Sequence, residues 1–520
     1  MPPEPPTPEP PAAFTSPPAV KPSARPASEP SATEPAAGPT VLSRSGPSAF
    51  DRLRALLADV PAPADRSPIS LHLGEARLVT PPVDGRLLAD VAGWTRYPPL
   101  GGTPELRAAY TGWLARRFGG HVAVAVREGS LAIEPSPGTK QAVAAAIALS
   151  VTASVTAPVS APITASAPAV VLPNPFYPTY HAAVQAAGGR AVFYAHASEL
   201  PAAVAGRRDV GAVVLCSPGN PRGETHTPDE LRAIATATWA AGALLVIDEC
   251  YIDLVHGAPA GGFLACGAAG TAGAAGIAGA AGIAGGAGRF LVLHSLSKRS
   301  GMPGLRSGFV VGDPASVAAY ANHNRACGVS TAEPVCAVAA RLWADDSHVA
   351  RLRSAVSANW DVADELLGEL PGYRRAEAGF FLWLPVPDDE EAARRLWREE
   401  AVMAMPGRYL GAPTDHGTTH GTTHSTTHST THSTTHGGTH TANHRANHCA
   451  NHGANHGANH GAGPGASPSA GPGASPAAAP GANPGAGHLR IALVHPQDRT
   501  REALTRVRRT LTTTAWELTR

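Results

Sequence analysis

The sequence predicts an α/β fold, with a large domain built on a mostly parallel sheet between helices and a smaller α+β domain. Apolar runs of the length of buried strands lie at Ala169–Leu172, Ala212–Cys216 and Ala243–Ile247, with helix-forming stretches between them. Strands that alternate with helices in this rhythm pair in parallel. A further run of the same kind is Phe290–Leu293. Because ligands bind beyond the carboxyl ends of such strands, we expect the functional residues to follow these runs.

The composition limits the class of protein. A chain of 520 residues suffices for two or three domains, but 55 glycines and 51 prolines indicate that part of the length is not packed core. A net charge of +1 gives no sign of binding to nucleic acid or to an anionic membrane. The six cysteines form no C-x-x-C pair, and the N-terminus lacks the pattern of a signal peptide. We therefore expect a reduced, cytoplasmic protein.

The N-terminal segment changes character near residue 48. Residues 1–47 are mainly Pro, Ala, Ser, Thr and Glu, which bury too little surface to offset the entropy of ordering, so we expect a disordered tail. Phe50, Leu53, Leu56 and Leu57 then share one face of a predicted helix. We assign residues 48–94 to the N-terminal part of the small domain.

The large domain is assigned to residues 95–325. Thr103-Pro104-Glu105 predicts a helix start, with Thr as the cap and Pro in the first turn. Gly138-Thr139 precedes an Ala-rich helix, whose free N–H groups can hold a phosphate, although Gly-Thr also serves as a simple cap. Residues 151–168 and 257–288 are interpreted as low-complexity surface insertions. The second carries no charge, but its Gly and Ala content argues against a membrane span.

The stretch from His294 to Phe309 contains the strongest candidate for chemistry. Lys298 lies among serine hydroxyls, and Arg306 follows eight residues later among glycines. A lysine that loses its proton can attack a carbonyl carbon and form a Schiff base. Ser295 and Arg306 are the donors that an adjacent phosphate would need. An isolated S-x-x-K segment of this kind is more often a surface Lys-Arg pair on a loop.

The C-terminal third is assigned to the small domain as residues 326–412 and 483–520. We expect an amphipathic helix over Trp343–Leu370 and a strand over Gly379–Leu384. Residues 413–482 interrupt this domain and carry a histidine at every fourth position from His416 to His460. That spacing suits metal ligands on a helix, but the Gly, Thr and Asn fillers disfavour a helix. We interpret the segment as a disordered insertion that binds nickel or zinc weakly, not as an evolved metal site, and expect activity to survive its removal.

Taken in order, the motifs resemble those of class I/II PLP-dependent aminotransferases, where PLP is pyridoxal 5'-phosphate. The motifs are PGTKQ, PNPFYPTY, SPGNPRG, DECY, SLSKRSGMPGLRSGF and PGRYLG, followed by NPGAGHLRIALV after the His-rich segment. The residues of the last three motifs are most similar to those of succinyldiaminopimelate aminotransferases. The resemblance implies PLP-dependent transferase fold type I. The N-terminal tail could not form the winged-helix domain of PLP-fold transcription regulators.

The resemblance also implies roles for individual residues. Lys298 would hold PLP as a Schiff base and move the substrate proton, and Asp248 would pair with the pyridinium nitrogen. The ring would be stacked by Tyr177 and bonded at its oxygen by Asn220 and Tyr251. The cofactor phosphate would be held by Gly138, Thr139, Ser295 and Arg306. Arg490 would bind the substrate carboxylate, which Gly74 lets approach the backbone.

The resemblance further implies a homodimer, in which Tyr97 reaches the cofactor phosphate of the partner subunit; otherwise Tyr97 is a packing aromatic. The expected substrates are an amino acid and a 2-oxo acid, namely glutamate and N-succinyl-2-amino-6-oxopimelate of the diaminopimelate route to lysine. Arg222, Arg325 and Arg408 are candidates for the distal carboxylate. The alternatives are an aspartate or broad-specificity aminotransferase and, further off, a non-enzymatic PLP- or metal-binding protein.

Overall fold

A seven-stranded sheet forms the centre of the large domain. The computed structural model describes residues 46–155, 167–258, 260–266, 288–413 and 481–512. The strand order is β2-β8-β7-β6-β5-β3-β4, and β8 alone runs antiparallel to its neighbours within these ranges. The strands are β2 (Ala132–Ser136), β3 (Ala169–Pro173), β4 (Arg190–Tyr194), β5 (Val210–Cys216), β6 (Leu244–Asp248), β7 (Phe290–Ser295) and β8 (Gly308–Gly312). The mostly parallel sheet predicted from the apolar runs is confirmed.

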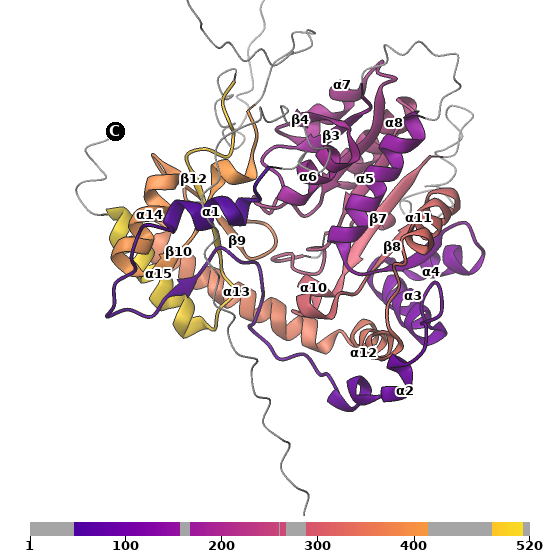
Figure 1. Cartoon of the computed structure of the whole chain (residues 1–520), viewed down its shortest axis with the longest axis horizontal. Helices are drawn as coiled ribbons and strands as arrows, with labels where there is room; N and C mark the ends of the chain where they lie inside the picture. Colours follow the sequence, from indigo (N-terminus) through magenta and orange to yellow (C-terminus); the bar gives the residue numbers. More distant parts are fainter. Residues whose placement is uncertain (1–45, 156–166, 259, 267–287, 414–480, 513–520) are drawn as a thin grey trace, which may run out of the picture. The chain divides into compact units, whose positions relative to one another are not determined.

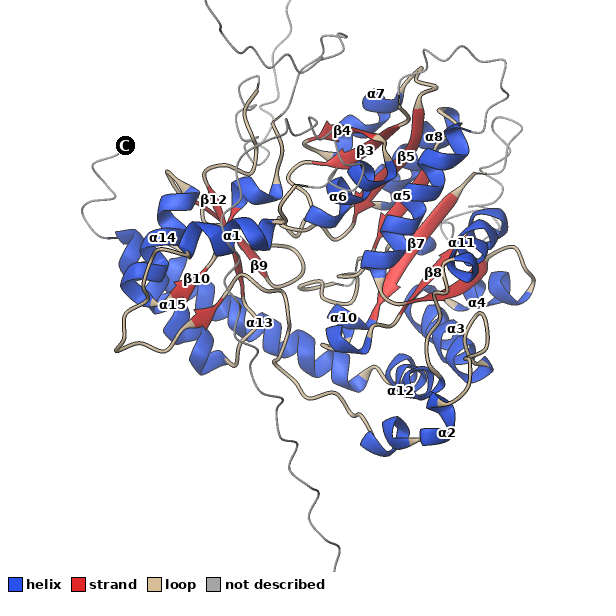
Figure 2. Cartoon of the chain, in the orientation of Figure 1, coloured by secondary structure: helices blue, strands red, loops and turns tan. Residues whose placement is uncertain are grey.

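Helices cover both faces of this sheet (Figure 2). The strands are apolar on both faces because successive side chains point to opposite sides, as Leu291 and Val292 do in β7. One face packs against α5 (Thr139–Val155), α6 (Pro178–Ala187) and α11 (Pro314–Ala326). The other packs against α3 (Pro104–Phe118), α4 (Gly120–Arg127), α7 (Leu200–Val204), α8 (Pro228–Ala240) and α12 (Glu333–Ala344).

A second core joins the N-terminal segment to the C-terminal third. In Figure 1 the indigo helix α1 lies among the orange and yellow elements, and its Leu53, Leu56 and Leu57 are buried there. The helices of this core are α1 (Ala49–Leu57), α13 (Ser347–Leu367), α14 (Asp389–Glu400) and α15 (Gln497–Thr512). Its sheets are β11 (Met405–Pro406), β12 (His488–Ala492) and β9 (Phe381–Pro385), antiparallel, and β1 (Ile69–Ser70) with β10 (Val402–Met403), parallel. These elements form the expected α+β domain.

Threonine side chains cap α3, as predicted, and α8. Thr103 caps α3, where its hydroxyl accepts a hydrogen bond from the N–H of Leu106 at 3.3 Å. Thr227 and Glu230 form a reciprocal capping box at the start of α8. Both starts place Pro in the first turn, where its missing N–H has no helical partner to lose.

The helix predicted over Trp343–Leu370 is wrong as a single element. The chain forms α12, ending at Ala344, and α13, beginning at Ser347. Asp345 between them is extended, and its carboxylate accepts hydrogen bonds from the N–H and hydroxyl of Ser347 at 2.8 and 2.9 Å. This competition for backbone donors ends one helix and starts the next. The boundary at residue 326 also needs revision, since α12 packs in the core of the large domain beside α3.

The two low-complexity stretches of the large domain begin later than expected. Helix α5 continues through Val155, so residues 151–155 are not irregular. Within 257–288, the short helix η3 (Phe263–Ala265) belongs to the fold, because Phe263 and Leu264 are buried in the core beside α8. Residues 156–166, 259 and 267–287 of these two stretches lie outside the described residues.

The proposed N-terminal tail, apart from its last two residues, and the His-rich tract also lie outside the described residues. Among the helices that the structure describes, none is both long and apolar enough to cross a membrane. In the same ranges, no three His, Cys, Asp or Glu side chains converge in a way that could hold a metal ion.

The two chain ends that flank residues 414–480 are bonded to each other. The Asn483 side chain donates to the carbonyls of Arg408 and Gly411 at 2.9 and 3.2 Å and accepts from the N–H of Gly485 at 2.9 Å. Asn174, just after β3, holds the same segment through two hydrogen bonds with the backbone of Ala412 at 2.8 and 3.2 Å. A short linker can therefore connect the two ends.

We expect that replacing residues 414–480 by a short glycine linker leaves the thermal midpoint and kcat/KM close to those of the intact chain. The matched variant Asn483→Ala removes the three bonds that join the ends and should destabilise both chains by about 1–3 kcal/mol. Calorimetry and steady-state kinetics measure both. A shortened chain that folds but is inactive would assign a function to the removed segment.

Candidate active site

The candidate active site lies at the carboxyl ends of three neighbouring parallel strands. Asp248 is the last residue of β6, Ser295 is the last residue of β7, and Asn220 lies in the loop that follows β5. Lys298 follows β7 directly, in the short helix α10 (Leu296–Arg299), which the Ser295 side chain caps. The sheet topology thus gathers residues that lie 78 positions apart between Asn220 and Lys298.

The Lys298 ammonium is held against the backbone of the N-terminal segment. Its Nζ donates a hydrogen bond to the carbonyl of Gly74 and lies 5.8 and 5.4 Å from the ring centres of Tyr251 and Phe380. Burial lowers the pKa of Lys298 to about 8, against opposing effects of neighbours that include Glu75 and Asp248. A lysine with this pKa presents a substantial neutral fraction near neutral pH and can act as a nucleophile.

The side chains of Phe381 and Lys298 leave little room for a side chain at Gly74. A Cβ at this position would lie 2.6 Å from Cζ of Phe381 and 3.2 Å from Nζ of Lys298. Only a residue without a side chain lets this backbone approach the lysine so closely. The structure therefore places Gly74 next to Lys298, a neighbour that the motifs had not indicated for it.

Asp248 is a buried carboxylate with two donors. Its Oδ2 accepts from the Tyr180 hydroxyl at 2.9 Å and its Oδ1 from the N–H of Cys250 at 3.2 Å. Burial raises the pKa of Asp248 above the ordinary value, and these two donors oppose the rise. The group is thus prepared to share a proton with a basic atom placed next to it.

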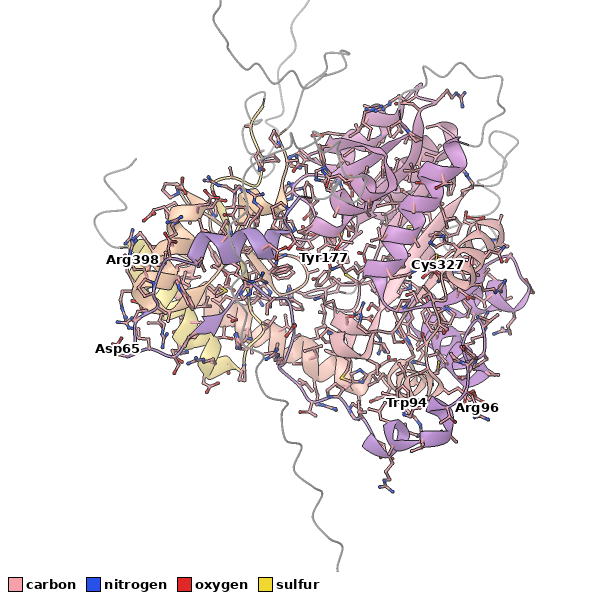
Figure 3. The ribbon with its side chains drawn as sticks, viewed as in Figure 1. Asp65, Trp94, Arg96, Tyr177, Cys327 and Arg398 are labelled. Carbon is pink, nitrogen blue, oxygen red and sulfur yellow. The ribbon has the colours of Figure 1, made fainter. Side chains whose placement is uncertain are left out.

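Tyr180 was not among the predicted site residues, although it lies three positions after Tyr177. Helix α6 begins directly after Tyr177, so both rings lie on one side of it, with centres 5.6 Å apart and the planes at 83°. Figure 3 marks Tyr177, whose pKa is raised by burial. The i, i+3 spacing was the available signal, but the bond to Asp248 depends on where α6 lies over β6.

A second group of residues lies where β2 and β7 flank β8. Ser136 and Ser295 both pair with Gly308, and a Cβ there would lie 3.2 Å from the Ser136 hydroxyl. Two residues after Ser136, Gly138 has a φ of +96°, and a Cβ on it would lie 2.9 Å from Nη2 of Arg306. The start of α5 and the Arg306 guanidinium are therefore adjacent, and Ser295 lies across β8 from Ser136.

This arrangement suits an anion. The first N–H groups of α5, from Thr139 onward, have no acceptor within the helix, and Arg306 adds a cationic donor. Arg306 is exposed and is positioned by donating to the carbonyls of Pro137 and Pro303 at 2.6 and 2.9 Å. Gly138, Thr139, Ser295 and Arg306 thus fit the anion site that the motifs implied.

Arg490 forms the third part of the site, from the middle of β12. Its Nη2 donates to the His72 carbonyl at 3.0 Å and its Nη1 to Oδ1 of Asn220 at 3.3 Å. The guanidinium carbon lies 4.2 Å from the centre of the Phe381 ring. Burial lowers the pKa of Arg490 to about 10, and its Nε has no hydrogen-bond partner among the described residues. A buried cation without a carboxylate partner is a site for an incoming carboxylate.

Tyr97 lies apart from these residues. Its side chain is fully exposed, in the segment between α2 (Val91–Trp94) and α3. Tyr251, in contrast, is buried beside Phe380 and Phe381, and burial raises its pKa well above the usual value. Within one chain, Tyr97 alone of the residues predicted to bind the cofactor lies away from this edge of the sheet.

The residues present fit a phosphorylated aldehyde with a basic ring. An amine nucleophile, a buried carboxylate and an anion cradle at Gly138, whose φ of +96° favours glycine, lie around one sheet edge. Fold and site together define an enzyme of the PLP-dependent transferase class.

The chain belongs to the aminotransferases of class I and II, whose family model matches residues 80–427. Members of this family use pyridoxal phosphate. The chain is 30% identical over 345 residues, 66% of its length and 86% of the relative's, to the 4-dedimethylamino-4-oxo-anhydrotetracycline transaminase OxyQ of Streptomyces rimosus. It is 26% identical over 378 residues, 66% of its length and 84% of the relative's, to an aspartate aminotransferase of Geobacillus stearothermophilus. The protein is a PLP-dependent aminotransferase.

Solved structures agree with this fold. An aminotransferase of Neisseria meningitidis aligns with a TM-score of 0.63 and 26% identity, covering 90% of this chain and 98% of its own. The N-succinyldiaminopimelate aminotransferase of Mycobacterium tuberculosis aligns with a TM-score of 0.61, covering 91% and 100%. Its identity is 20%, so this likeness shows the fold alone.

We expect the reaction of Lys298 with aldehydes in the cofactor-free protein to follow its lowered pKa. The ammonium form, which cannot attack a carbonyl, dominates below a pH of about 8, so the labelling rate should rise with pH and level off above that value. Reductive methylation with formaldehyde, followed by peptide mass spectrometry, measures it, and Lys298→Ala identifies the peptide. A rate that keeps rising to a pH of about 10, the ordinary value for lysine, would contradict the effect of burial.

Proposed function

We propose that this aminotransferase moves an amino group from glutamate to a 2-oxo acid in the cytoplasm, with Lys298 as the catalytic residue. The observation that carries the assignment is the Lys298 amine, which burial brings to a pKa of about 8 at the sheet edge that also holds Asp248. When bound, the cofactor supplies an electron sink for the carbanion at the substrate Cα. The chain supplies the groups that hold the reactants and move the proton.

Lys298 has two tasks in this proposal. It would hold the cofactor, and its Nζ, once free, would take the proton from the substrate Cα as a general base. The carbonyl of Gly74, which accepts a hydrogen bond from Nζ, and the rings of Tyr251 and Phe380 keep the amine at one place. This pre-orientation favours proton transfer over a short and fixed path.

The other residues hold the cofactor. Asp248, bonded by Tyr180 and Cys250, would accept a hydrogen bond from the protonated ring nitrogen. Tyr177 would stack on the ring, while Tyr251 and the amide of Asn220, whose Oδ1 is engaged with Arg490, would bond the ring oxygen. The phosphate would lie against the start of α5, with Gly138, Thr139, Ser295 and Arg306 as its donors.

Arg490 would bind the α-carboxylate of the substrate. Its Nη2 and Nη1 are positioned by His72 and Asn220, and its Nε is buried without a partner in the described chain. A carboxylate that binds there gains two parallel, charge-assisted hydrogen bonds. Its charge also offsets the unfavourable free energy of burying an unpaired cation.

The acceptor we propose is N-succinyl-2-amino-6-oxopimelate, on the wording of the Lys298 segment, PGRYLG and NPGAGHLRIALV. Its distal carboxylate needs a cation. Arg408 does not serve, because Asp388, Asp389 and Glu390 hold it at 3.2, 2.6 and 3.0 Å. Arg222, bonded to Glu224 at 3.1 Å and to a carbonyl, and Arg325 remain candidates.

A second candidate acceptor is a ring ketone. The observation that favours it is the 30% identity to the transaminase of Streptomyces rimosus, whose name describes a 4-oxo-anhydrotetracycline substrate. Such a substrate needs no distal cation, and aromatic side chains such as Tyr177, Tyr251 and Phe381 would face it.

A panel of acceptors with glutamate as donor tests these proposals. If the succinylated acceptor is correct, its kcat/KM should exceed those of oxaloacetate, phenylpyruvate and 2-oxoisocaproate by tenfold or more, which is about 1.4 kcal/mol of transition-state preference. Lys298→Ala should lose the half-reaction with every amino acid and the visible absorption of the bound cofactor. Arg222→Ala or Arg325→Ala should lower kcat/KM for this acceptor alone, by about tenfold to a hundredfold. A tenfold preference for oxaloacetate, an aromatic oxo acid or a ring ketone would refute the succinylated acceptor.

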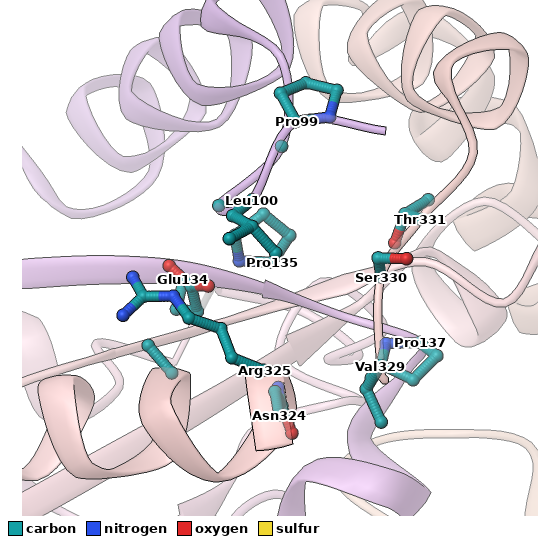
Figure 4. Close-up of a pocket in the computed structure, with 13 residues that line it drawn as sticks. Pro99, Leu100, Glu134, Pro135, Pro137, Asn324, Arg325, Val329, Ser330 and Thr331 are labelled. Carbon is teal, nitrogen blue, oxygen red and sulfur yellow. The ribbon is translucent and has the colours of Figure 1, made fainter. Parts of the chain in front are cut away.

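We further propose that the enzyme is a homodimer joined through the segment around Tyr97. Large apolar side chains are exposed there, namely Leu88, Val91, Trp94, Tyr97 and Leu100. Figure 3 marks Trp94 beside Arg96 on this segment. The pocket in Figure 4, lined by Leu100, Glu134, Arg325 and Thr331 among others, opens next to it. Such a patch is typical of a surface that a second copy covers.

We expect light scattering to give twice the mass of one chain. Trp94→Asp should shift the protein towards the monomer and lower its activity, because a carboxylate in an apolar interface is costly to bury. Tyr97→Phe should keep the dimer and weaken the retention of PLP without ending catalysis, since only the hydroxyl is lost. A fully active monomer would refute a shared site.

A further inference from the structure

Three buried polar side chains form a hydrogen-bonded chain behind the candidate active site. The Tyr110 hydroxyl lies 2.7 Å from Nδ1 of His294, and Nε2 of His294 lies 3.0 Å from Oε2 of Glu249. Oε1 of Glu249 accepts a further bond from the N–H of Phe263 at 2.6 Å. All three side chains are at most 1% exposed. The chain thus links α3, β7, the end of β6 and η3.

With the imidazole proton on Nε2, every polar hydrogen of these three side chains has one acceptor. The Glu249 carboxylate accepts from Nε2–H of His294 and from the N–H of Phe263, while Nδ1 of His294 accepts from the Tyr110 hydroxyl. Aromatic rings enclose the imidazole, with that of Trp113 at 4.8 Å and that of Phe118 at 5.6 Å. Apolar side chains of similar size would often stabilise such a core equally well or better. Stability alone therefore gives no reason for three polar groups here.

Two of these hydrogen-bonded residues are sequence neighbours of residues in the candidate active site. Glu249 follows Asp248, and His294 precedes Ser295. Because successive residues point to opposite faces of the sheet, Glu249 and His294 lie on one face and Asp248 and Ser295 on the other. Besides its side-chain bond to His294, Glu249 donates its backbone N–H to the carbonyl of Leu293 at 3.0 Å. The ends of β6 and β7 are therefore joined twice, once through the backbone and once through the buried side chains.

We propose that Tyr110, His294 and Glu249 are positioning residues. They set the separation between Asp248 and the short helix α10 that carries Lys298, and thereby the affinity for PLP. The proposal rests on the roles of Asp248 and Lys298 given above. Asp248 is the last residue of β6 and pairs with Cys216 and Leu293, whereas Lys298 lies beyond the end of β7, outside the strand pairing. One cofactor has to meet both residues. A misplacement of about 1 Å at a reacting group can cost about a hundredfold in rate.

Tyr110→Phe is the decisive variant because it removes one hydroxyl and keeps the ring, which is stacked on Phe309 at 3.9 Å. Its matched control is Tyr194→Phe, a buried tyrosine of the same core that donates to the Val214 carbonyl at 3.0 Å and has no contact with His294 or Glu249. Fluorescence titration of the cofactor-free protein gives the Kd for PLP, absorption spectra report on the bound cofactor, and calorimetry gives the thermal midpoint.

We expect both variants to lower the thermal midpoint by similar amounts. Tyr110→Phe should also raise the Kd for PLP by about five- to tenfold, the effect of one lost hydrogen bond, and change the visible absorption maximum. Tyr194→Phe should leave the Kd within about twofold of the parent. Glu249→Gln should act in the same direction as Tyr110→Phe, with Glu400→Gln as the control for a buried glutamate elsewhere.

An unchanged Kd and spectrum in Tyr110→Phe would overturn the positioning role, whether or not Glu249→Gln folds. An equal rise in the Kd for both tyrosine variants would overturn it too, because the effect would then be general to the core. Failure of the proposed function has a different signature, namely a Lys298→Ala protein that still attaches the cofactor covalently.

Discussion

The buried guanidinium of Arg490 is the constraint on which the site depends. It lies within one hydrogen bond of His72 from the N-terminal segment and of Asn220 from the large domain, and it packs on Phe381. A carbonyl and an amide oxygen are weak partners for a cation removed from water. The fold therefore holds this charge in a state that a carboxylate ligand would relieve, and the same two bonds bring three distant segments of the chain to one place.

Desolvation acts on the three charged groups of the site in the same sense. It lowers the pKa of Lys298 to about 8 and of Arg490 to about 10, and it raises the pKa of Asp248. Each shift favours the neutral form, because little water and few counter-charges remain. A carboxylate complements Arg490, a protonated ring nitrogen complements Asp248, and an aldehyde complements Lys298; in our proposal the substrate supplies the first group and PLP the other two. The electrostatics of the protein alone thus indicate the kind of molecule that completes the site.

The fold was largely accessible from the sequence, since the predicted apolar runs match β3, β5, β6 and β7 to within two residues. The break at Asp345 was not, because amphipathic patterns continue on both sides and a local side-chain bond decides it. The roles of Tyr180 and Phe263 depend on how α6 and η3 pack, which no local pattern encodes. Motifs find residues that touch a ligand, whereas residues that hold those residues become visible only in three dimensions.

The polarity of the sheet explains why long low-complexity segments can interrupt this enzyme. One follows the C-terminal end of α5, whose N-terminal end forms the anion site, and another ends just before β7, whose far end carries Ser295 and leads to Lys298. The described residues before the first segment and after the second therefore lie at the edge of the sheet opposite to the site. The third leaves beside Asn174 at the functional edge, where Asn483 bonds its two flanks together. The entropic cost of a longer loop grows only slowly with its length, so a fold that fixes the loop ends can accept such segments without moving the residues of the site.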